Sequence, residues 1–268
     1  MGTMTLTSPF RCFVARPDAA VRLYCFPHGG GAASAFHRLA HRLPEWIEVR
    51  AVQYPGRQDR YGDPMPASVE ALAEEVVRGL GTPFDRPTAF LGHSMGAVVA
   101  FEAARRLRPR FPSPLTALFV SACKAPAERL PRGVRYDEDE VRAYLRELGG
   151  EGARALEADE ELWQLAYPVI SGDLRLVERY RYTAGAPLTC PLVAIGGEDD
   201  PSVPTGDLAL WKDYTDGGAE IRTVEGGHFY FEEDLDPLVS ILTGTLGQLA
   251  HAARRLGPSG MGGGSFFG

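Results

Sequence analysis

The sequence lacks the features that mark several large classes of protein. It has only four cysteines in 268 residues, at positions 12, 25, 123 and 190, and no CxxC pair. A zinc knuckle or a dithiol redox site is therefore not expected. No stretch approaches the roughly 20 apolar residues of a membrane span, and the amino terminus has no uninterrupted apolar run of the signal-peptide kind. We expect no membrane association and a cytoplasmic location.

Positive charge is also scarce. The chain carries 28 Lys and Arg against 35 Asp and Glu, a formal net charge of -7. A surface that neutralises nucleic-acid phosphates needs an excess of basic residues, so nucleic acid is not an expected partner. The composition, 44% hydrophobic and 24% charged, is typical of a folded soluble enzyme, and the length suits one α/β domain.

Short apolar runs alternate with stretches of helical spacing along most of the chain. The runs predict strands at residues 21–26, 49–54, 88–92, 115–122, 192–195 and 221–224. Helices are predicted at residues 33–43, 69–80, 95–107 and 237–254. Strands and helices that alternate in this way favour an α/β fold with a mainly parallel sheet and helices on both faces.

The alternation is interrupted between about residues 124 and 187, where the sequence is helical throughout. Asp137 can cap a helix with one apolar stripe, and two further stripes follow, of which Pro168 should end or kink the first. Such short helices need the main domain to bury their stripes. We expect a helical lid; an insertion without a role in substrate binding is the alternative.

Residues 1–256 are thus predicted to form a single domain that contains this insertion. The remaining residues, 257–268, are rich in glycine and cannot build a core. We expect a flexible tail without a function.

The pentapeptide Gly92-His93-Ser94-Met95-Gly96 is the strongest local signal. It has the form G-x-S-x-G, and it stands between a predicted strand and a predicted helix. Flanking glycines permit a sharp turn that leaves the serine hydroxyl exposed at the edge of the sheet, as in the nucleophile turn of α/β-hydrolases. An ordinary tight turn is the alternative, but the context favours Ser94 as a nucleophile in an α/β-hydrolase fold.

A serine nucleophile needs a histidine that accepts its proton and a carboxylate that orients the histidine. In this fold the chain order is serine, acid, histidine, and only His228 and His251 follow Ser94. His251 lies within the last predicted helix, whereas His228 follows a glycine pair just after a predicted strand. We therefore expect His228 to be the base.

The acid should lie in the loop after the predicted strand at residues 192–195. Three carboxylates stand there side by side, Glu198, Asp199 and Asp200. Spacing alone does not choose among them, and only one of the three should point inward. Asp200 is favoured, and Asp199 is the alternative.

Two backbone amides should stabilise the oxyanion of a tetrahedral intermediate. One is expected from Met95, the residue after the nucleophile, and the other from a glycine-rich loop after an early strand. The segment Phe26-Pro27-His28-Gly29-Gly30-Gly31 fits this description, with Gly29 as the donor. A phosphate-binding loop is excluded because the segment lacks the Lys and the Ser or Thr of such loops.

Together these segments resemble the type II thioesterases that accompany polyketide and nonribosomal peptide synthases. The resemblance is carried by FPHGGG at 26–31, VQYPGR at 52–57, GHSMG at 92–96, GEDDPSV at 197–203 and GGHF at 226–229. The family's acid stands in a D-x-x-V pattern, which selects Asp200. Its members often have alanine where this chain has Gly29.

The resemblance implies an editing enzyme that hydrolyses acyl thioesters on the phosphopantetheine arms of acyl or peptidyl carrier domains. It implies no cofactor and no metal, and we expect a monomer. Carrier domains are usually acidic, so two groups of arginines near the ends of the insertion are candidates for docking. They are Arg129, Arg132 and Arg135, and Arg175, Arg179 and Arg181. Simple solvated surface is the alternative for both groups.

Two other enzymatic functions are compatible with the same site, and a third function, that of a non-catalytic receptor of the same fold, is disfavoured. A carboxylester hydrolase or lipase would use the same three side chains on oxygen esters, and an acyltransferase would deliver the acyl group to an alcohol or amine. A hydrolase-fold receptor would be expected to lack one of the three. The YPGR segment at 54–57 favours a thioesterase over a lipase.

Overall fold

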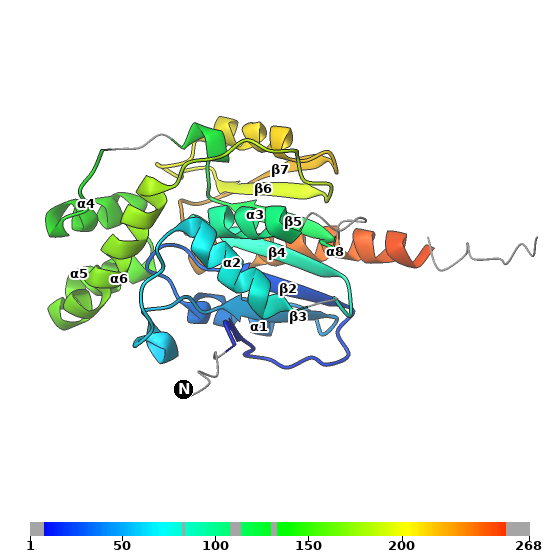
Figure 1. The fold of residues 1–268 in the computed structure, drawn as a ribbon, viewed down its shortest axis with the longest axis horizontal. Coiled ribbons are helices and arrows are strands. Elements are labelled where there is room, and N and C mark those ends of the chain that lie inside the picture. The colour runs from blue at the N-terminus through cyan, green and yellow to red at the C-terminus, as the bar shows by residue number, and fades with distance from the viewer. Residues whose placement is uncertain (1–7, 82–83, 108–113, 130–132, 256–268) are drawn as a thin grey trace, which may run out of the picture.

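The computed structural model describes residues 8–81, 84–107, 114–129 and 133–255, and the structural statements below concern these ranges. The glycine-rich tail predicted at 257–268 lies outside them. Seven strands form one sheet in the order β1-β3-β2-β4-β5-β6-β7 (Figure 1). The strands are β1 (Phe10–Arg11), β2 (Val21–Phe26), β3 (Ile47–Val52), β4 (Thr88–His93), β5 (Ala117–Ser121), β6 (Leu192–Gly197) and β7 (Ala219–Val224). Only β1 is antiparallel to its neighbour, so the predicted mainly parallel sheet is confirmed.

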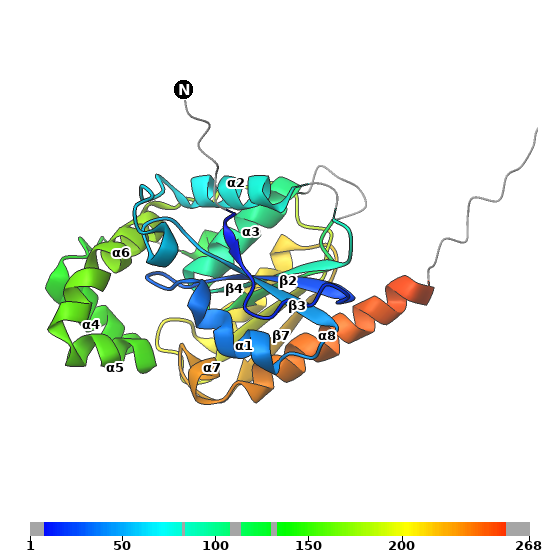
Figure 2. The ribbon, with the colours of Figure 1, turned by 90° about the horizontal axis from the view of Figure 1, so that it is seen from below.

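Helices cover both faces of this sheet (Figure 2). Helices α2 (Val69–Leu80) and α3 (Met95–Leu107) lie on one face, and α1 (His37–Arg42), α7 (Tyr230–Glu233) and α8 (Asp236–Arg255) lie on the other. Short 3-10 helices are found at η1 (Ala33–Phe36), η2 (Gln58–Arg60), η3 (Pro126–Glu128) and η4 (Thr205–Tyr214). None of the helices in the described ranges has both the length and the hydrophobicity of a membrane span.

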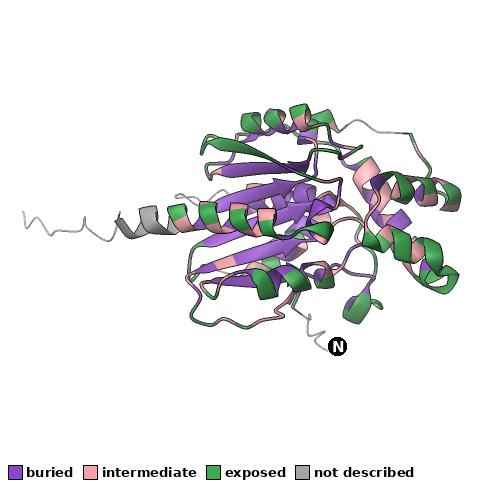
Figure 3. Cartoon of the chain, turned by 180° about the vertical axis from the view of Figure 1, so that it is seen from behind, coloured by how far each residue is buried: buried purple, intermediate pink, exposed green. Residues whose placement is uncertain are grey.

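The strands β2 to β6 are buried on both sides, because successive side chains point to opposite faces and helices cover each face. In β2, Leu23 and Cys25 pack with α1 and α8, whereas Tyr24 and Phe26 pack with α2 and α3. In Figure 3 the central strands are coloured mostly as buried, whereas the helices show a mixture of buried and exposed residues. Each large apolar side chain buried in this way contributes about 1.5–3 kcal/mol to folding. The sheet is therefore a rigid base for the loops at its carboxyl edge.

The insertion between β5 and β6 forms α4 (Glu138–Leu148), α5 (Glu151–Ala158) and α6 (Glu160–Arg179), which stand away from the sheet (Figure 1). Asp137 caps α4 as predicted, in a capping box with Glu140. The helix α6 does not end at Pro168 but continues to Arg179. The proline removes one helical hydrogen bond, but Trp163 and Ile170 on either side of it pack in the insertion's own apolar cluster and hold the helix together.

Candidate active site

Ser94 lies at the tip of a sharp turn between β4 and α3. Its φ is +54°, in the left-handed region that non-glycine residues seldom adopt. The turn needs glycine on both sides: a Cβ on Gly92 would lie 2.3 Å from the Gly96 carbonyl oxygen, and a Cβ on Gly96 would lie 2.0 Å from that of Phe26. The backbone N–H of Ser94 donates to the Ser121 carbonyl oxygen at 2.8 Å. These contacts hold the partly exposed hydroxyl of Ser94 above the carboxyl end of β4.

Asp200 and His228 meet in the loops that follow the last two strands, β6 and β7. Asp200 follows β6, and His228 follows β7 after Gly226, whose φ is +110°. The Nδ1 atom of His228 lies 2.8 Å from Oδ2 of Asp200, and both side chains are buried, 2% and 0% exposed. Asp199, the alternative acid, is exposed. The structure therefore brings Asp200, and not Asp199, into contact with His228.

The other carboxylate oxygen of Asp200, Oδ1, also accepts hydrogen bonds. Oδ1 accepts hydrogen bonds from the N–H and the hydroxyl of Ser202, each at 2.8 Å, and from the N–H of Val203 at 3.3 Å. Burial tends to raise the pKa of Asp200, but the hydrogen bonds from His228 and Ser202 outweigh it, and the net pKa is lowered. Asp200 is thus an anion at neutral pH. The D-x-x-V spacing has a structural explanation here, because the backbone N–H of the fourth residue, Val203, donates a hydrogen bond to the carboxylate of the first residue, Asp200.

Ser94 and His228 line the same cavity, which has a volume of about 530 Å³. The Nε2 atom of His228 is buried and has no hydrogen-bond partner among the described residues. No hydrogen bond joins Ser94 and His228 in this part of the chain, which is common for such pairs without substrate. The imidazole is therefore oriented from the Asp200 side, with its other nitrogen unpaired.

The loop of residues 28–31 lies beside the Ser94 turn. A Cβ on Gly29 would lie 3.9 Å from the Cβ of Met95. Met95 is the first residue of α3, so its N–H has no acceptor within the helix. In the described chain, no residue accepts a hydrogen bond from the N–H of Gly29 or of Met95. The two predicted oxyanion donors are thus neighbours, and both are available to a ligand.

Two further histidines, His28 and His93, lie near His228 but are poorly suited to act as bases. Burial, followed by the nearby His228 and Arg57, lowers the pKa of His28 to about 4. Burial likewise lowers the pKa of His93 well below its usual range, and its Nδ1 lies 2.9 Å from the Ser121 hydroxyl. Both rings are neutral at pH 7 and are weak bases. His251 lies in α8, as its position in the last predicted helix suggested.

One buried acid was missed by the sequence analysis. Asp173 lies on α6, is 0% exposed, and pairs with Arg57 through two N–H···O bonds of 2.6 and 2.9 Å. The same carboxylate accepts the N–H of Gly30 at 2.7 Å. The only sequence signal was an acidic residue that interrupts an apolar stripe. Asp173 therefore joins the insertion to the YPGR segment and to the glycine loop.

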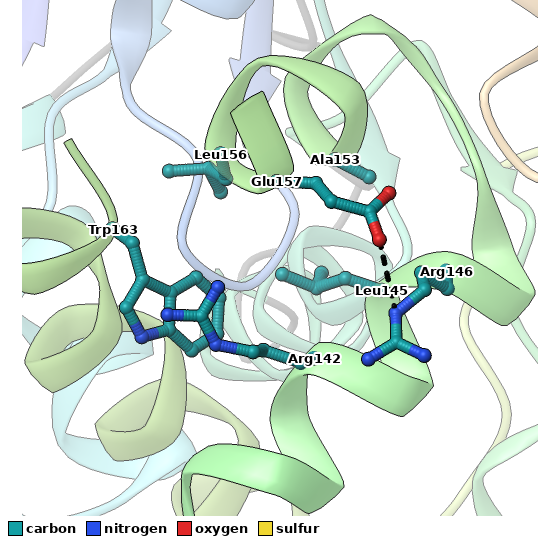
Figure 4. Close-up of a pocket in the computed structure, with 7 residues that line it drawn as sticks. All are labelled: Arg142, Leu145, Arg146, Ala153, Leu156, Glu157 and Trp163. Atoms are coloured by element: carbon teal, nitrogen blue, oxygen red, sulfur yellow. Dashed lines mark ion pairs between the residues drawn. The ribbon is translucent and has the colours of Figure 1, made fainter. Parts of the chain in front are cut away.

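The insertion walls the cavity that contains Ser94. Apolar side chains from all three of its helices line this cavity, including Tyr144, Leu148, Leu156, Ile170, Leu174 and Val177. A second cavity of about 80 Å³ lies within the insertion itself (Figure 4). There the Arg142 guanidinium lies 3.9 Å from the centre of the Trp163 ring, and Arg146 pairs with Glu157 at 3.3 Å. These contacts hold the three helices together as a unit.

Potential metal ligands and two buried thiols are the side chains on which a metal site or a reactive cysteine would depend. Within the described ranges, no group of three or more His, Cys, Asp or Glu side chains is placed to hold a metal ion. Burial raises the pKa of the Cys25 thiol and of the Cys123 thiol, which keeps both protonated.

Comparison with known proteins gives the family. Residues 21–246 match the thioesterase domain family. Thioesterase PikA5 of Streptomyces venezuelae is 41% identical over 225 residues, which cover 83% of this chain and 80% of that protein. The medium-chain S-acyl fatty acid synthase thioesterase of Homo sapiens is 34% identical over 235 residues, 85% of this chain and 86% of that protein.

Solved structures agree with this result. The type II thioesterase BorB from the borrelidin biosynthetic cluster has a TM-score of 0.82 and 36% identity, covering 91% of this chain and 100% of that chain. The thioesterase RedJ from the prodiginine pathway of Streptomyces coelicolor has a TM-score of 0.78 and 33% identity, covering 86% and 87%. The resemblance to type II thioesterases is thus confirmed. The chain belongs to the thioesterase domain family, and it is a hydrolase of the α/β-hydrolase fold that acts on thioesters.

Proposed function

We propose that Ser94, Asp200 and His228 are the catalytic triad of this thioesterase, and that the N–H groups of Gly29 and Met95 form its oxyanion hole. The observation that carries the proposal is the buried Asp200–His228 pair at the wall of the cavity that contains Ser94. A buried carboxylate on Nδ1 keeps the proton there, so that Nε2 is free to act as the base. The lowered pKa of Asp200 supports this role.

The reaction proceeds in two acyl transfers. Ser94 Oγ attacks the thioester carbonyl while His228 Nε2 accepts its proton, and the oxyanion is stabilised by Gly29 and Met95. The intermediate collapses with loss of the thiol, which takes the proton from His228, and an acyl-Ser94 ester remains. Water then attacks this ester with His228 again as base. The bond between the acyl carbon and Ser94 Oγ breaks as Oγ takes the proton back from His228, and the carboxylic acid is released. A thiol leaves far more readily than an alcohol, which lightens the demand on the acid step.

The substrates we propose are acyl groups on the phosphopantetheine arms of carrier domains, removed as an editing step. Two similar proteins come from biosynthetic systems, BorB from the borrelidin cluster and RedJ from the prodiginine pathway, which supports a role of this kind. The cavity of about 530 Å³ falls within the usual range for small-molecule sites, and its walls are mostly apolar. We infer that residues 124–187 act as the lid over the acyl chain and set its permitted size.

Several of the arginines predicted to dock a carrier domain are already engaged in contacts within the chain. Arg175 donates to the carbonyl oxygens of Arg135 and Tyr136, and Arg181 to those of Glu178 and Tyr180. The guanidinium of Arg129 donates to the Cys123 sulfur. Arg132 lies outside the described residues. Arg135, Arg179 and Arg181 are exposed, but the guanidinium of Arg181 is engaged by the carbonyl oxygens named above, which leaves Arg135 and Arg179. We propose these two as the docking residues for an acidic carrier domain, and charge reversal at both should lower turnover of carrier-bound substrate but not of small thioesters.

The test compares Ser94→Ala with the natural enzyme on three substrates that carry the same acyl group. These are an acyl-carrier domain, an acyl-coenzyme A and a simple oxygen ester. We expect carrier-bound thioester to be preferred, and the variant to be folded but inactive on all three. Turnover by Ser94→Ala would remove Ser94 from the mechanism, whereas faster cleavage of the oxygen ester would favour the esterase alternative. The proposal also includes a cytoplasmic monomer, and size-exclusion chromatography checks the oligomeric state.

A further inference from the structure

The Arg57–Asp173 ion pair lies where the lid meets the glycine loop. Both side chains are buried, 5% and 0% exposed, and the two parallel hydrogen bonds fix their orientation as well as their distance. The ring of Tyr54 lies beneath the guanidinium, 5.4 Å from its carbon. A buried ion pair seldom adds much net stability, because both charges lose their hydration. Stability alone therefore does not explain this pair.

Both partners of the pair also bind the backbone of the loop. Asp173 Oδ2 accepts the N–H of Gly30 at 2.7 Å, and Arg57 Nη1 donates to the Gly31 carbonyl oxygen at 3.0 Å. The N–H of Gly31 in turn donates to the His28 carbonyl oxygen at 2.9 Å. That oxygen belongs to the same planar peptide unit as the N–H of Gly29. The ion pair therefore controls, through two glycines, the direction in which the Gly29 N–H points.

The lid helix braces the same loop by packing. Ile170, Asp173 and Leu174 stand three and four residues apart and so share one face of α6. A Cβ on Gly30 would lie 2.5 Å from Cγ1 of Ile170, and a Cβ on Gly29 would lie 3.6 Å from the Cβ of Asp173. Helix and loop are thus in direct contact. Three consecutive glycines have little conformational preference of their own, so the loop depends on such outside contacts.

We propose that Asp173, held by Arg57, is a positioning residue for the oxyanion hole. It fixes the Gly29 N–H in the direction that the tetrahedral oxyanion requires, and the hole is complete only when α6 is seated on the loop. This inference rests on the proposed function and adds a dependence of catalysis on the lid. Asp173 touches neither substrate nor Ser94 in this role.

The test replaces Asp173 by asparagine, which has nearly the same size but cannot accept both the Arg57 fork and the Gly30 N–H. Displacement of a catalytic group by about 1 Å costs on the order of 100-fold in rate. We expect Asp173→Asn to lower kcat by about 10- to 100-fold and to leave KM within about threefold. Affinity for an alkylboronic acid, which forms a tetrahedral adduct with the serine hydroxyl, should fall by a similar factor. Affinity for a thioether analogue of the substrate, which has no oxyanion, should not change.

The matched control is Tyr180→Phe. The Tyr180 hydroxyl donates to Glu102 at 2.8 Å and so ties the end of α6 to α3, but it makes no contact with the loop. Its loss should leave kcat and boronic acid affinity unchanged. If Asp173→Asn does not fold, the double variant Arg57→Gln with Asp173→Asn leaves no unpaired buried charge, and it should show the same loss of boronic acid affinity.

Two results would overturn the inference. One is a folded single or double variant with kcat and boronic acid affinity within twofold of the natural enzyme. The other is an equal loss in Tyr180→Phe, which would mean that general seating of the lid matters and the ion pair does not. Ser94→Ala is measured in parallel. If it still hydrolyses thioesters the proposed function fails, whereas an inactive Ser94→Ala beside a fully active Asp173→Asn overturns only this inference.

Discussion

Replacing Asp200 by asparagine should remove nearly all activity, because the structure dictates which way the new amide would point. The Oδ1 position of Asp200 receives three hydrogen bonds, from the N–H and hydroxyl of Ser202 and from the N–H of Val203. Three donors require an oxygen there, so the NH₂ group of the asparagine must occupy the Oδ2 position, 2.8 Å from His228 Nδ1. It would donate to that nitrogen and force the proton onto Nε2.

A histidine in that tautomer cannot accept the proton of Ser94. We expect kcat to fall by about 10⁴-fold, which is about 5 kcal/mol of transition-state stabilisation. The assay follows release of free thiol from an acyl thioester, with rapid mixing to separate formation of the acyl-enzyme from its hydrolysis. Both steps should slow, because both use His228 as base.

The neighbouring Asp199→Asn is the matched control, because the two residues are adjacent and only Asp199 is exposed. Its activity should stay within about twofold of the natural enzyme, as is usual for exposed positions. The reasoning would be refuted if Asp199→Asn lost more activity than Asp200→Asn, or if Asp200→Asn kept more than about a tenth of the natural kcat.

Three further predictions concern the loops around Ser94. Gly96→Ala should destabilise the fold by on the order of 3 kcal/mol in urea denaturation, since its Cβ would lie 2.0 Å from the Phe26 carbonyl oxygen; an unchanged midpoint would contradict this. Gly29→Ala should keep both stability and kcat/KM, because its Cβ meets no atom closer than 3.6 Å; a loss above tenfold would count against it. His28, with its pKa lowered from 6.5 to about 4, takes up its proton more readily in the unfolded chain, so stability falls as the pH falls from 6.5 to about 4. His28→Gln should remove up to about 3 kcal/mol of that fall, and melting curves with the same pH dependence as the natural enzyme would disprove it.

The sequence was sufficient to predict a mainly parallel sheet with six of its seven strands and the main helices along the chain, because these elements carry their own local pattern, whereas the short β1 and α7 were not predicted. The strand predicted at 49–54 is displaced by two residues from β3 (Ile47–Val52). The shift arises because the residues after Val52 serve the site: the side chain of Gln53 accepts the N–H of Ala33 and donates to the Arg57 carbonyl oxygen. The local pattern of apolar residues carries no information about hydrogen-bond partners that are distant in the sequence.

The choice between Asp199 and Asp200 shows a different limit. The two residues share a loop, a charge and a size, and only the direction of one turn buries the second against His228. Spacing could not decide this, and the D-x-x-V pattern could only indicate it by resemblance. The pairing of Asp173 with Arg57 could not be predicted from the sequence, since the two residues are 116 positions apart and Asp173 belongs to no motif. Ion pairs between distant segments are a property of the folded chain.

Two hydrogen-bond systems lie beside the cavity that contains Ser94, and they share no residue. One consists of Asp200, Ser202 and His228, and it comes from the loops after β6 and β7. The other joins Arg57 to Asp173 and thereby the loop after β2 to the lid. The first system is carried by the sheet alone and would be the same under any lid. The second needs α6, so exchange of this lid for another helical insertion would keep the base and lose the support of the oxyanion loop. Under the proposed role of Asp173, the insertion supports the oxyanion loop in addition to lining the cavity, and Arg57 of the YPGR segment is the residue to which it is attached.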